Sequence, residues 1–313
     1  MKKRILSCFM ALALCLTLLP TAALAADAEQ AHPDHPICGK TCSHTGADET
    51  THPNDAFANA KWLASSYGDL AVQTSSSSSS GNRLTGGDNY VTLTTGYYYL
   101  SNTVENYDHL SYVGSQKTIK IDGDVTICLN GTQIQKVGDT TGSVFEVPSG
   151  STLTLTDCGS AGKVMCDGNS HGSGVYVNGG TLNLYSGQIA KSNGQNGTGS
   201  NQSNRYGGGV YMKSGTFNMY GGAITGNSAN YGGGVYVKSG TFNMNGGTIE
   251  NNTSSGGFGE LSFGGAGVYV EASGNFIMKN GASVTANTIG YGSTGGGGVY
   301  VNGGTFTMNG DAS

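Results

Sequence analysis

The stretch GGGVYVKSGTFNMNGGTI, residues 232–249, carries the pattern that decides the fold. Apolar side chains alternate with other residues at Val235 and Val237, and again at Phe242 and Met244. A period of two is typical of β-strands, because successive side chains of a strand point to opposite faces. A Gly-containing connection of a few residues separates the two runs and is too short for a helix. The stretch therefore predicts short strands joined by tight turns.

The same pattern recurs in five copies, and their spacing indicates how the strands pair. The copies start at the equivalent residues Val175, Val210, Val235, Val268 and Val299, so that the repeat is 25–35 residues long. A single copy cannot bury its apolar side chains, but each strand can pair with the same strand of the next copy. The sequence thus predicts an all-β fold, a right-handed parallel β-helix (β-solenoid) with three short strands per coil.

Stacking the coils about 4.8 Å apart places like residues on like residues. Four interior columns are predicted: Val175, Val210, Val235, Val268 and Val299; Leu182, Phe217, Phe242, Phe276 and Phe306; Leu184, Met219, Met244, Met278 and Met308; Ile189, Ile224, Ile249 and Val284. An outward column of Tyr176, Tyr211, Tyr236, Tyr269 and Tyr300 is also expected. At a turn, Asn227, Asn252 and Asn287 are expected to form a ladder in left-handed backbone, which Asn tolerates.

The residues before the β-rich part of the chain divide into three regions by composition. Residues 1–25 combine a basic start, an apolar stretch and a small-residue cleavage site, as in a secretory signal peptide. We therefore expect a secreted protein, extracellular or at the cell surface, with no membrane span in the mature chain. Residues 26–60 form a polar segment with His and Cys, and residues 61–88 form a linker that includes the serine run 75–80.

The β-rich part of the chain is expected to start at residue 89. Residues 89–170 predict an N-terminal β region with the first, less regular coils and their cap, and residues 119–155 supply the apolar residues of those coils. Residues 171–313 are the regular repeats. Because the pattern stops after the second strand of a coil, we expect the repeats to continue beyond Ser313.

The repeat motifs resemble those of bacterial surface proteins with a pectin-lyase-like right-handed parallel β-helix. GGGVYV at 296–301 and GGTFTMNG at 303–310 are similar to glycine-rich repeats of large secreted proteins of gut Firmicutes. GGAI at 221–224 and FxxN at 242–245 are similar to motifs of the polymorphic outer membrane proteins of chlamydiae.

Departures from the chlamydial motifs favour the resemblance to the repeats of secreted Firmicutes proteins. Tyr220 and Lys279 stand where FxxN requires Asn, and no translocator barrel follows the repeats in this sequence. The resemblance covers residues 119–313. It implies surface exposure and adhesion, and it implies no catalytic residue.

The charge balance and the placement of the acids bear on two function classes. With 15 Lys and Arg against 20 Asp and Glu, the net charge of −5 argues against a nucleic-acid partner. An enzyme on this fold, a polysaccharide lyase or a glycoside hydrolase, needs clustered acids. In the repeats the acids are Glu250, Glu260, Glu271 and Asp311, which do not recur as a pair. Earlier candidates are Asp122, Asp124, Asp157 and Asp167, although Asp in Gly-rich turns is usually structural.

The corner that accepts insertions between repeats is the candidate binding site. Its candidate ligand-binding residues are Arg205, Tyr206, Tyr231, Phe258, Glu260, Phe263 and Tyr291. Aromatic rings can stack on sugar rings, and the neighbouring Asn and Ser can bond hydroxyls. The alternative is that these aromatic residues only cover the corner of the solenoid.

Two groups of cysteines each allow more than one interpretation. His35, Cys38, Cys42 and His44 have ligand types that suit Zn²⁺, while a Cys38–Cys42 disulfide or an unstructured polar leader explains the same residues. Cys158 and Cys166 are either a disulfide or small buried residues. No other cofactor is expected.

Taken together, the sequence predicts a non-enzymatic, adhesin-like or glycan-binding scaffold. Its expected partners are extracellular glycans or host surface proteins. A carbohydrate-active enzyme and a purely structural spacer are the alternatives.

Overall fold

Every regular element of the computed structural model, within the residues that it describes, is a β-strand. The structure describes residues 61–66, 69–73, 82–83, 90–100, 118–137, 142–158, 161–167, 172–192, 194–196, 205–254, 264–279, 281–290 and 295–313. All of them belong to one unit, Ile37–Ser313. The predicted signal peptide and the polar segment lie outside the described residues.

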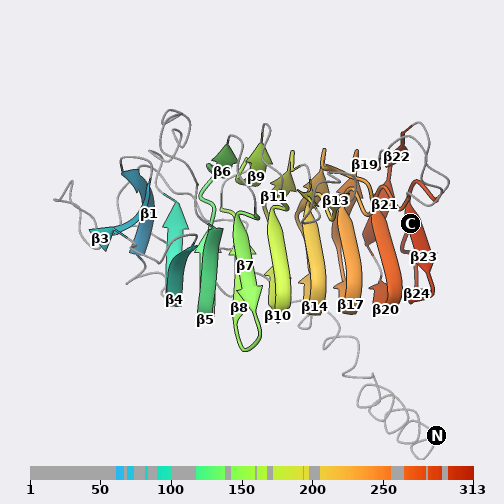
Figure 1. The fold of residues 1–313 in the computed structure, drawn as a ribbon, viewed down its shortest axis with the longest axis horizontal. Coiled ribbons are helices and arrows are strands. Elements are labelled where there is room, and N and C mark those ends of the chain that lie inside the picture. Colours follow the sequence, from blue (N-terminus) through green and yellow to red (C-terminus); the bar gives the residue numbers. More distant parts are fainter. Residues whose placement is uncertain are drawn as a thin grey trace, which may run out of the picture. The chain divides into compact units, whose positions relative to one another are not determined.

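One long strand per coil builds the largest sheet, and each such strand pairs in parallel with its counterpart in the next coil (Figure 1). These strands are β4 (Tyr90–Leu100), β5 (Thr118–Cys128), β10 (Val175–Leu184), β14 (Val210–Met219), β17 (Val235–Met244) and β20 (Val268–Met278). Two shorter strands take the same place in other coils: β7 (Phe145–Pro148) with β8 (Thr152–Thr156), and β23 (Val299–Asn302) with β24 (Thr305–Met308). The register aligns the five repeat valines as predicted.

The remaining strands follow the long ones and stack in the same way. The second parallel sheet contains β6 (Gln133–Val137), β9 (Lys163–Asp167), β11 (Gln188–Ala190), β15 (Ala223–Thr225), β18 (Gly247–Glu250) and β21 (Ala282–Thr285). The third contains β16 (Ser228–Ala229), β19 (Thr253–Ser254) and β22 (Thr288–Ile289). An antiparallel pair, β12 (Gln195–Asn196) and β13 (Arg205–Tyr206), stands in the corner insertion. The architecture is the predicted parallel β-helix.

The strand lengths differ from the prediction, because the first two strands of a coil merge into one bent strand of 10 or 11 residues. In β10, β14 and β17 the two runs meet at a glycine with left-handed backbone, such as Gly215 (φ 100°) and Gly240 (φ 87°). A Cβ at Gly240 would lie 2.1 Å from the carbonyl oxygen of Gly215. Glycine is therefore required there both for the conformation and for the close approach of the coils.

The N-terminal end of the largest sheet departs from parallel stacking. Strand β1 (Lys61–Ser66) pairs in parallel with β4, whereas β2 (Asp69–Gln73) runs antiparallel to β1, and β3 (Asn82–Arg83) antiparallel to β2. Part of the predicted linker thus forms strands at the edge of β4, and its serine run lies outside the described residues. Pairing this edge removes a row of open backbone groups.

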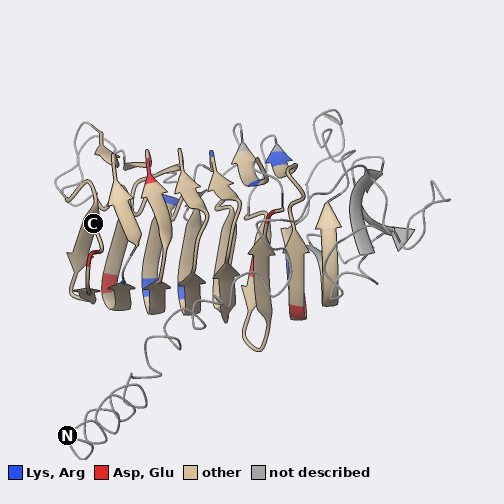
Figure 2. Cartoon of the chain, turned by 180° about the vertical axis from the view of Figure 1, so that it is seen from behind, with Lys and Arg blue, Asp and Glu red and all other residues tan. Residues whose placement is uncertain are grey.

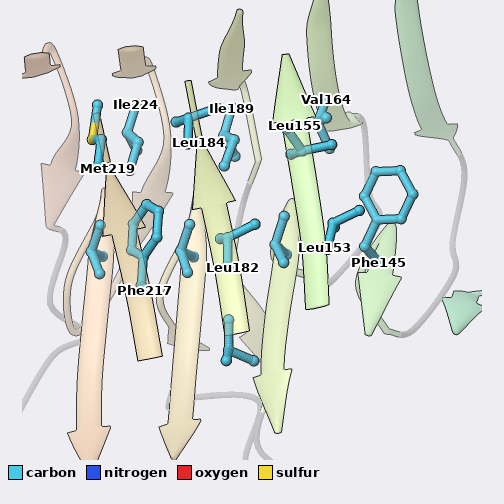
Figure 3. Packing of buried hydrophobic residues seen from close by; sticks show 14 of the residues in the cluster. Phe145, Leu153, Leu155, Val164, Leu182, Leu184, Ile189, Phe217, Met219 and Ile224 are labelled. Atoms are coloured by element: carbon cyan, nitrogen blue, oxygen red, sulfur yellow. The ribbon is translucent and has the colours of Figure 1, made fainter. Parts of the chain in front are cut away.

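The interior columns are as predicted (Figure 3). Phe217, Phe242 and Phe276 are fully buried, and their rings stack with centroids 4.4 and 4.7 Å apart. The earlier coils continue this interior with fully buried residues that include Ile121, Ile127, Phe145, Leu153 and Leu155. In the last coil Phe306 and Met308 are 36% and 55% exposed, since no described coil covers them.

The asparagine ladder is confirmed, but its backbone conformation was predicted one position too late. The Oδ1 atom of Asn252 accepts from the N–H and the Nδ2 of Asn227 at 3.0 and 2.9 Å, and Asn287 does the same for Asn252. The left-handed residues are those just before the ladder, Asn251 (φ 55°) and Ala286 (φ 51°). The residue before each ladder asparagine takes the left-handed conformation, and the asparagine itself points inward.

Candidate functional site

The outward column of the largest sheet changes from charged residues to tyrosines along the helix. Lys120 is aligned with Glu146, which is aligned with Tyr176. The column then continues through Tyr211, Tyr236, Tyr269 and Tyr300, with neighbouring ring centroids 5.2–5.4 Å apart. The predicted column therefore exists.

A second row of tyrosines from the variable corner lies against this column. The rings of Tyr206 and Tyr231 stack at 5.2 Å with an angle of 14°. Tyr206 also lies 4.9 Å from Tyr236, and Tyr231 lies 5.4 Å from Tyr269. We name the two rows together the tyrosine cluster; its members are Tyr176, Tyr206, Tyr211, Tyr231, Tyr236, Tyr269 and Tyr300.

The second row covers part of the first. Tyr236 and Tyr269 are only 4% exposed, whereas Tyr206, Tyr211 and Tyr231 remain partly exposed. The prediction of an outward column needs this correction, because two of its members are buried under the corner. The alternative that the corner aromatic residues cover the solenoid therefore holds for part of their surface.

Hydrogen bonds between coils fix the position of the second row. The Oδ1 atom of Asn230 accepts from the backbone N–H of Arg205 at 2.8 Å. The carbonyl of Arg205 accepts from the N–H groups of Asn230 and Tyr231, both at 3.0 Å. Directly after the corner, Gly207 and Gly232 take left-handed backbone with φ of 55° and 64°, which returns the chain to the long strand. The partly exposed Arg205 is thus held beside Tyr206.

Two polar side chains of the following coils bond the buried phenols. Glu271 Oε2 accepts from the hydroxyl of Tyr236 at 2.6 Å, and Asn302 Nδ2 donates to the hydroxyl oxygen of Tyr269 at 2.9 Å. Burial, and secondarily the bond to Glu271, raises the pKa of Tyr236. Burial, followed by the neighbouring Tyr176, Tyr206 and Glu271, raises the pKa of Tyr211 to about 12. These phenols therefore remain protonated at neutral pH.

The ring geometry limits the chemistry of the cluster. Because Tyr206 and Tyr231 stack face to face on each other, the faces between them cannot take a sugar ring. The ring of Tyr206 also stacks with that of Tyr211 at 6.0 Å. The partly exposed surface of Tyr206, Tyr231 and Arg205 thus combines phenol groups with a guanidinium. Such groups bind hydroxylated ligands by hydrogen bonds and edge contacts.

The other predicted site residues cannot be placed with this cluster. Phe258, Glu260, Phe263 and Tyr291 lie outside the described residues, and so do His35, Cys38, Cys42 and His44. Within the described ranges, no group of three or more His, Cys, Asp or Glu side chains is arranged to hold a metal ion.

The carboxylates in the described coils are few and separated (Figure 2), and several have structural partners. The two oxygens of Asp157 accept from the N–H groups of Gly131 and Gly162 at 2.7 and 2.8 Å. Glu146 accepts from Asn178 Nδ2 at 3.1 Å, and Glu271 is engaged with Tyr236. The expectation that Asp in a Gly-rich turn is structural is confirmed for Asp157.

Sequence reasoning missed a second polar ladder and a second tyrosine stack. Asn183, Asn218 and Asn243 bond side chain to side chain at 3.0 and 2.9 Å on the outer face of the long strands. Tyr185 and Tyr220 stack at 4.6 Å just after the ends of β10 and β14. The signal for the ladder was the recurring Asn between the two apolar residues Leu/Phe and Leu/Met of the first three repeats.

In the described part of the chain, no helix has the length and apolar character to cross a membrane. A scan against models of known protein families, a search of curated proteins and a search of solved structures each found no match to this chain.

Proposed function

We propose that the protein is a non-enzymatic, secreted or cell-surface scaffold that binds glycans through the tyrosine cluster. The observation that carries the proposal is the gathering of seven tyrosines on successive coils that backbone hydrogen bonds hold together, with Arg205 next to Tyr206 in the chain. A row of partly exposed phenols is a common recognition surface for hydroxylated ligands, because each presents an apolar ring and a polar tip.

The rigid repeat supports binding by several weak contacts. Tyr211 and Tyr300 are partly exposed on β14 and β23, and Tyr206 and Tyr231 extend the same surface toward the corner. A linear glycan that runs along the stacked coils would contact successive hydroxyls at once, which raises the overall affinity through effective concentration. Host surface proteins that carry such glycans are the partners in this proposal.

The enzyme alternative has less support. The carboxylate of Glu271, which lies against the cluster, accepts a hydrogen bond from the hydroxyl of Tyr236, and acid–base hydrolysis needs two carboxylates flanking one bond. Secretion and adhesion rest on the signal-peptide pattern of residues 1–25 and on the resemblance to surface repeat proteins.

A glycan array probed with the full chain, followed by calorimetry on the best ligand, tests the proposal. Tyr206→Ser combined with Tyr231→Ser should weaken binding by about tenfold or more, the equivalent of about 1.4 kcal/mol. The matched control is Tyr185→Ser with Tyr220→Ser, which removes an equally stacked pair elsewhere on the same coils and should leave affinity unchanged.

Three results would contradict the proposal. Absence of binding on the array would favour the structural spacer. Equal losses in both double variants would place the ligand elsewhere. Release of oligosaccharides from a polysaccharide by the unmodified chain would establish the enzyme alternative.

A further inference from the structure

A lysine and a cysteine lie side by side on neighbouring strands inside the early coils. Lys136 on β6 and Cys166 on β9 are directly aligned in the parallel register of the second sheet. Adjacent parallel strands lie about 4.8 Å apart, and aligned side chains leave the sheet on the same face. That face is the interior here, since Ile134 and Val164, two residues earlier on the same strands, are buried.

Both side chains are out of contact with solvent. Lys136 is 2% exposed and Cys166 is fully buried. Lys136 Nζ lies 3.3 Å from Thr118 Oγ1, and Cys166 Sγ donates to the carbonyl of Gly142 at 4.0 Å. A Cβ built on Gly142 would lie 3.5 Å from Lys136 Nζ, so that both reactive ends lie against this glycine.

A buried lysine has the properties of a nucleophile. Desolvation lowers the pKa of Lys136 to about 8, and the nearby Cys166 opposes that shift only in part. A large fraction of the amine is therefore neutral in mildly alkaline solution. A neutral amine next to an oxidised cysteine can attack the sulfur, just as a backbone nitrogen does when it forms a sulfenamide.

We propose that Lys136 and Cys166 are a modification site at which a peroxide joins the two side chains through a sulfur–nitrogen bond. Hydrogen peroxide first oxidises the Cys166 thiol to the sulfenic acid and is itself reduced to water. The Lys136 amine then attacks Sγ; the S–N bond forms, the S–O bond breaks, and the hydroxide leaves as a second water with one proton of the amine. The protein loses two electrons and two protons, which is two hydrogen atoms in total.

The consequence is a covalent tie between two successive coils. A thiol reductant reverses it, because a thiol can attack the same sulfur and release the amine. The link also removes the positive charge of Lys136 from the interior, where an ammonium is costly. This site is independent of the tyrosine cluster.

Peptide mapping of the full chain after exposure to hydrogen peroxide tests the proposal. Trypsin cuts after an unmodified Lys136 but cannot recognise it once its amine is bonded to sulfur. We expect cleavage after Lys136 to disappear and a linked species of residues 121–163 and 164–191 to appear, two hydrogens lighter than the sum of the free peptides. Dithiothreitol should restore the cleavage.

The controls separate this link from a disulfide, which loses the same two hydrogens. A disulfide from Cys166 to Cys128 or Cys158 leaves the bond after Lys136 open to trypsin. Cys166→Ser should retain full cleavage under peroxide, and so should the unmodified chain oxidised in guanidinium, where the register is lost. The proposal is overturned if cleavage after Lys136 persists while Cys166 becomes a disulfide or a sulfinic acid, or if Cys166 remains unmodified.

Discussion

Replacing Asn252 by alanine should destabilise the β-helix far more than removing a similar asparagine from its surface. Asn252 is fully buried, and its Nδ2 donates to the carbonyl of Ile224 at 2.9 Å and to Asn287 Oδ1 at 2.9 Å. Its Oδ1 accepts from the N–H and the Nδ2 of Asn227. Asn252 therefore joins three successive coils.

The magnitude follows from the groups that lose their partner. Asn252→Ala leaves the N–H of Asn227 and the carbonyl of Ile224 buried without this bond, and one N–H of the Asn227 amide as well. Each buried group left without a hydrogen bond costs about 1–3 kcal/mol. For three such groups we expect the free energy of unfolding to fall by about 3 kcal/mol or more.

Asn243→Ala is the matched control, because Asn243 belongs to the outer ladder of the same coil and is partly exposed. Solvent can replace its bonds, so the expected loss is about 0.5–1.5 kcal/mol. Urea denaturation followed by far-UV circular dichroism measures both. If the two variants lose the same stability to within about 1 kcal/mol, the buried ladder does not hold the coils as described.

Two further predictions test the interior charge and the bends of the long strands. Lys136→Met should raise the free energy of unfolding by about 3 kcal/mol at pH 7, since the pKa of Lys136 falls from 10.5 to about 8 on folding and each pKa unit corresponds to about 1.4 kcal/mol. The pKa of Lys136 is lower in the folded than in the unfolded chain, so the unmodified chain should gain stability as the pH rises from about 8 to 10.5. The Met variant should lack this gain, which urea titrations at each pH can measure. Gly240→Ala should destabilise the protein by about 3 kcal/mol or more, because the new methyl group meets the carbonyl of Gly215. The control Gly226→Ala should cost about 1 kcal/mol, since Gly226 also has left-handed backbone but a Cβ there would have nothing within 4 Å. Equal losses of thermal stability in the two variants would argue against close stacking of the long strands at these glycines.

The interior could be predicted from the sequence because it depends on alternation and spacing. A valine recurs at the place of Val235 in every copy, and Leu182 or a phenylalanine recurs at the place of Phe242. A coil that cannot bury these residues alone must use its neighbours. The ladder of Asn227, Asn252 and Asn287 followed from the same alignment. The merging of two strands into one could not be read in this way, because Gly215 and Gly240 look like breaks in a sequence, whereas left-handed glycines bend a strand without ending it.

The candidate site was predictable only in part. Tyr206 and Tyr231 were identified because they close the variable corner, but their packing over Tyr236 and Tyr269 depends on how the insertions fold back. The pairing of Lys136 with Cys166 was missed for a related reason. The early coils have irregular lengths, so their register follows from neighbouring strands rather than from a repeat that the sequence displays.

Spin labels on adjacent coils measure whether equivalent residues of successive repeats lie side by side in parallel register. Thr216 on β14 and Thr241 on β17 are aligned partners on the outer face of the largest sheet. In a variant without native cysteines, nitroxides at Thr216→Cys and Thr241→Cys should give a spectrum strongly broadened by spin–spin coupling, as expected for strands about 4.8 Å apart. A spectrum equal to the sum of the two singly labelled variants would contradict the stacked register and, with it, the fold.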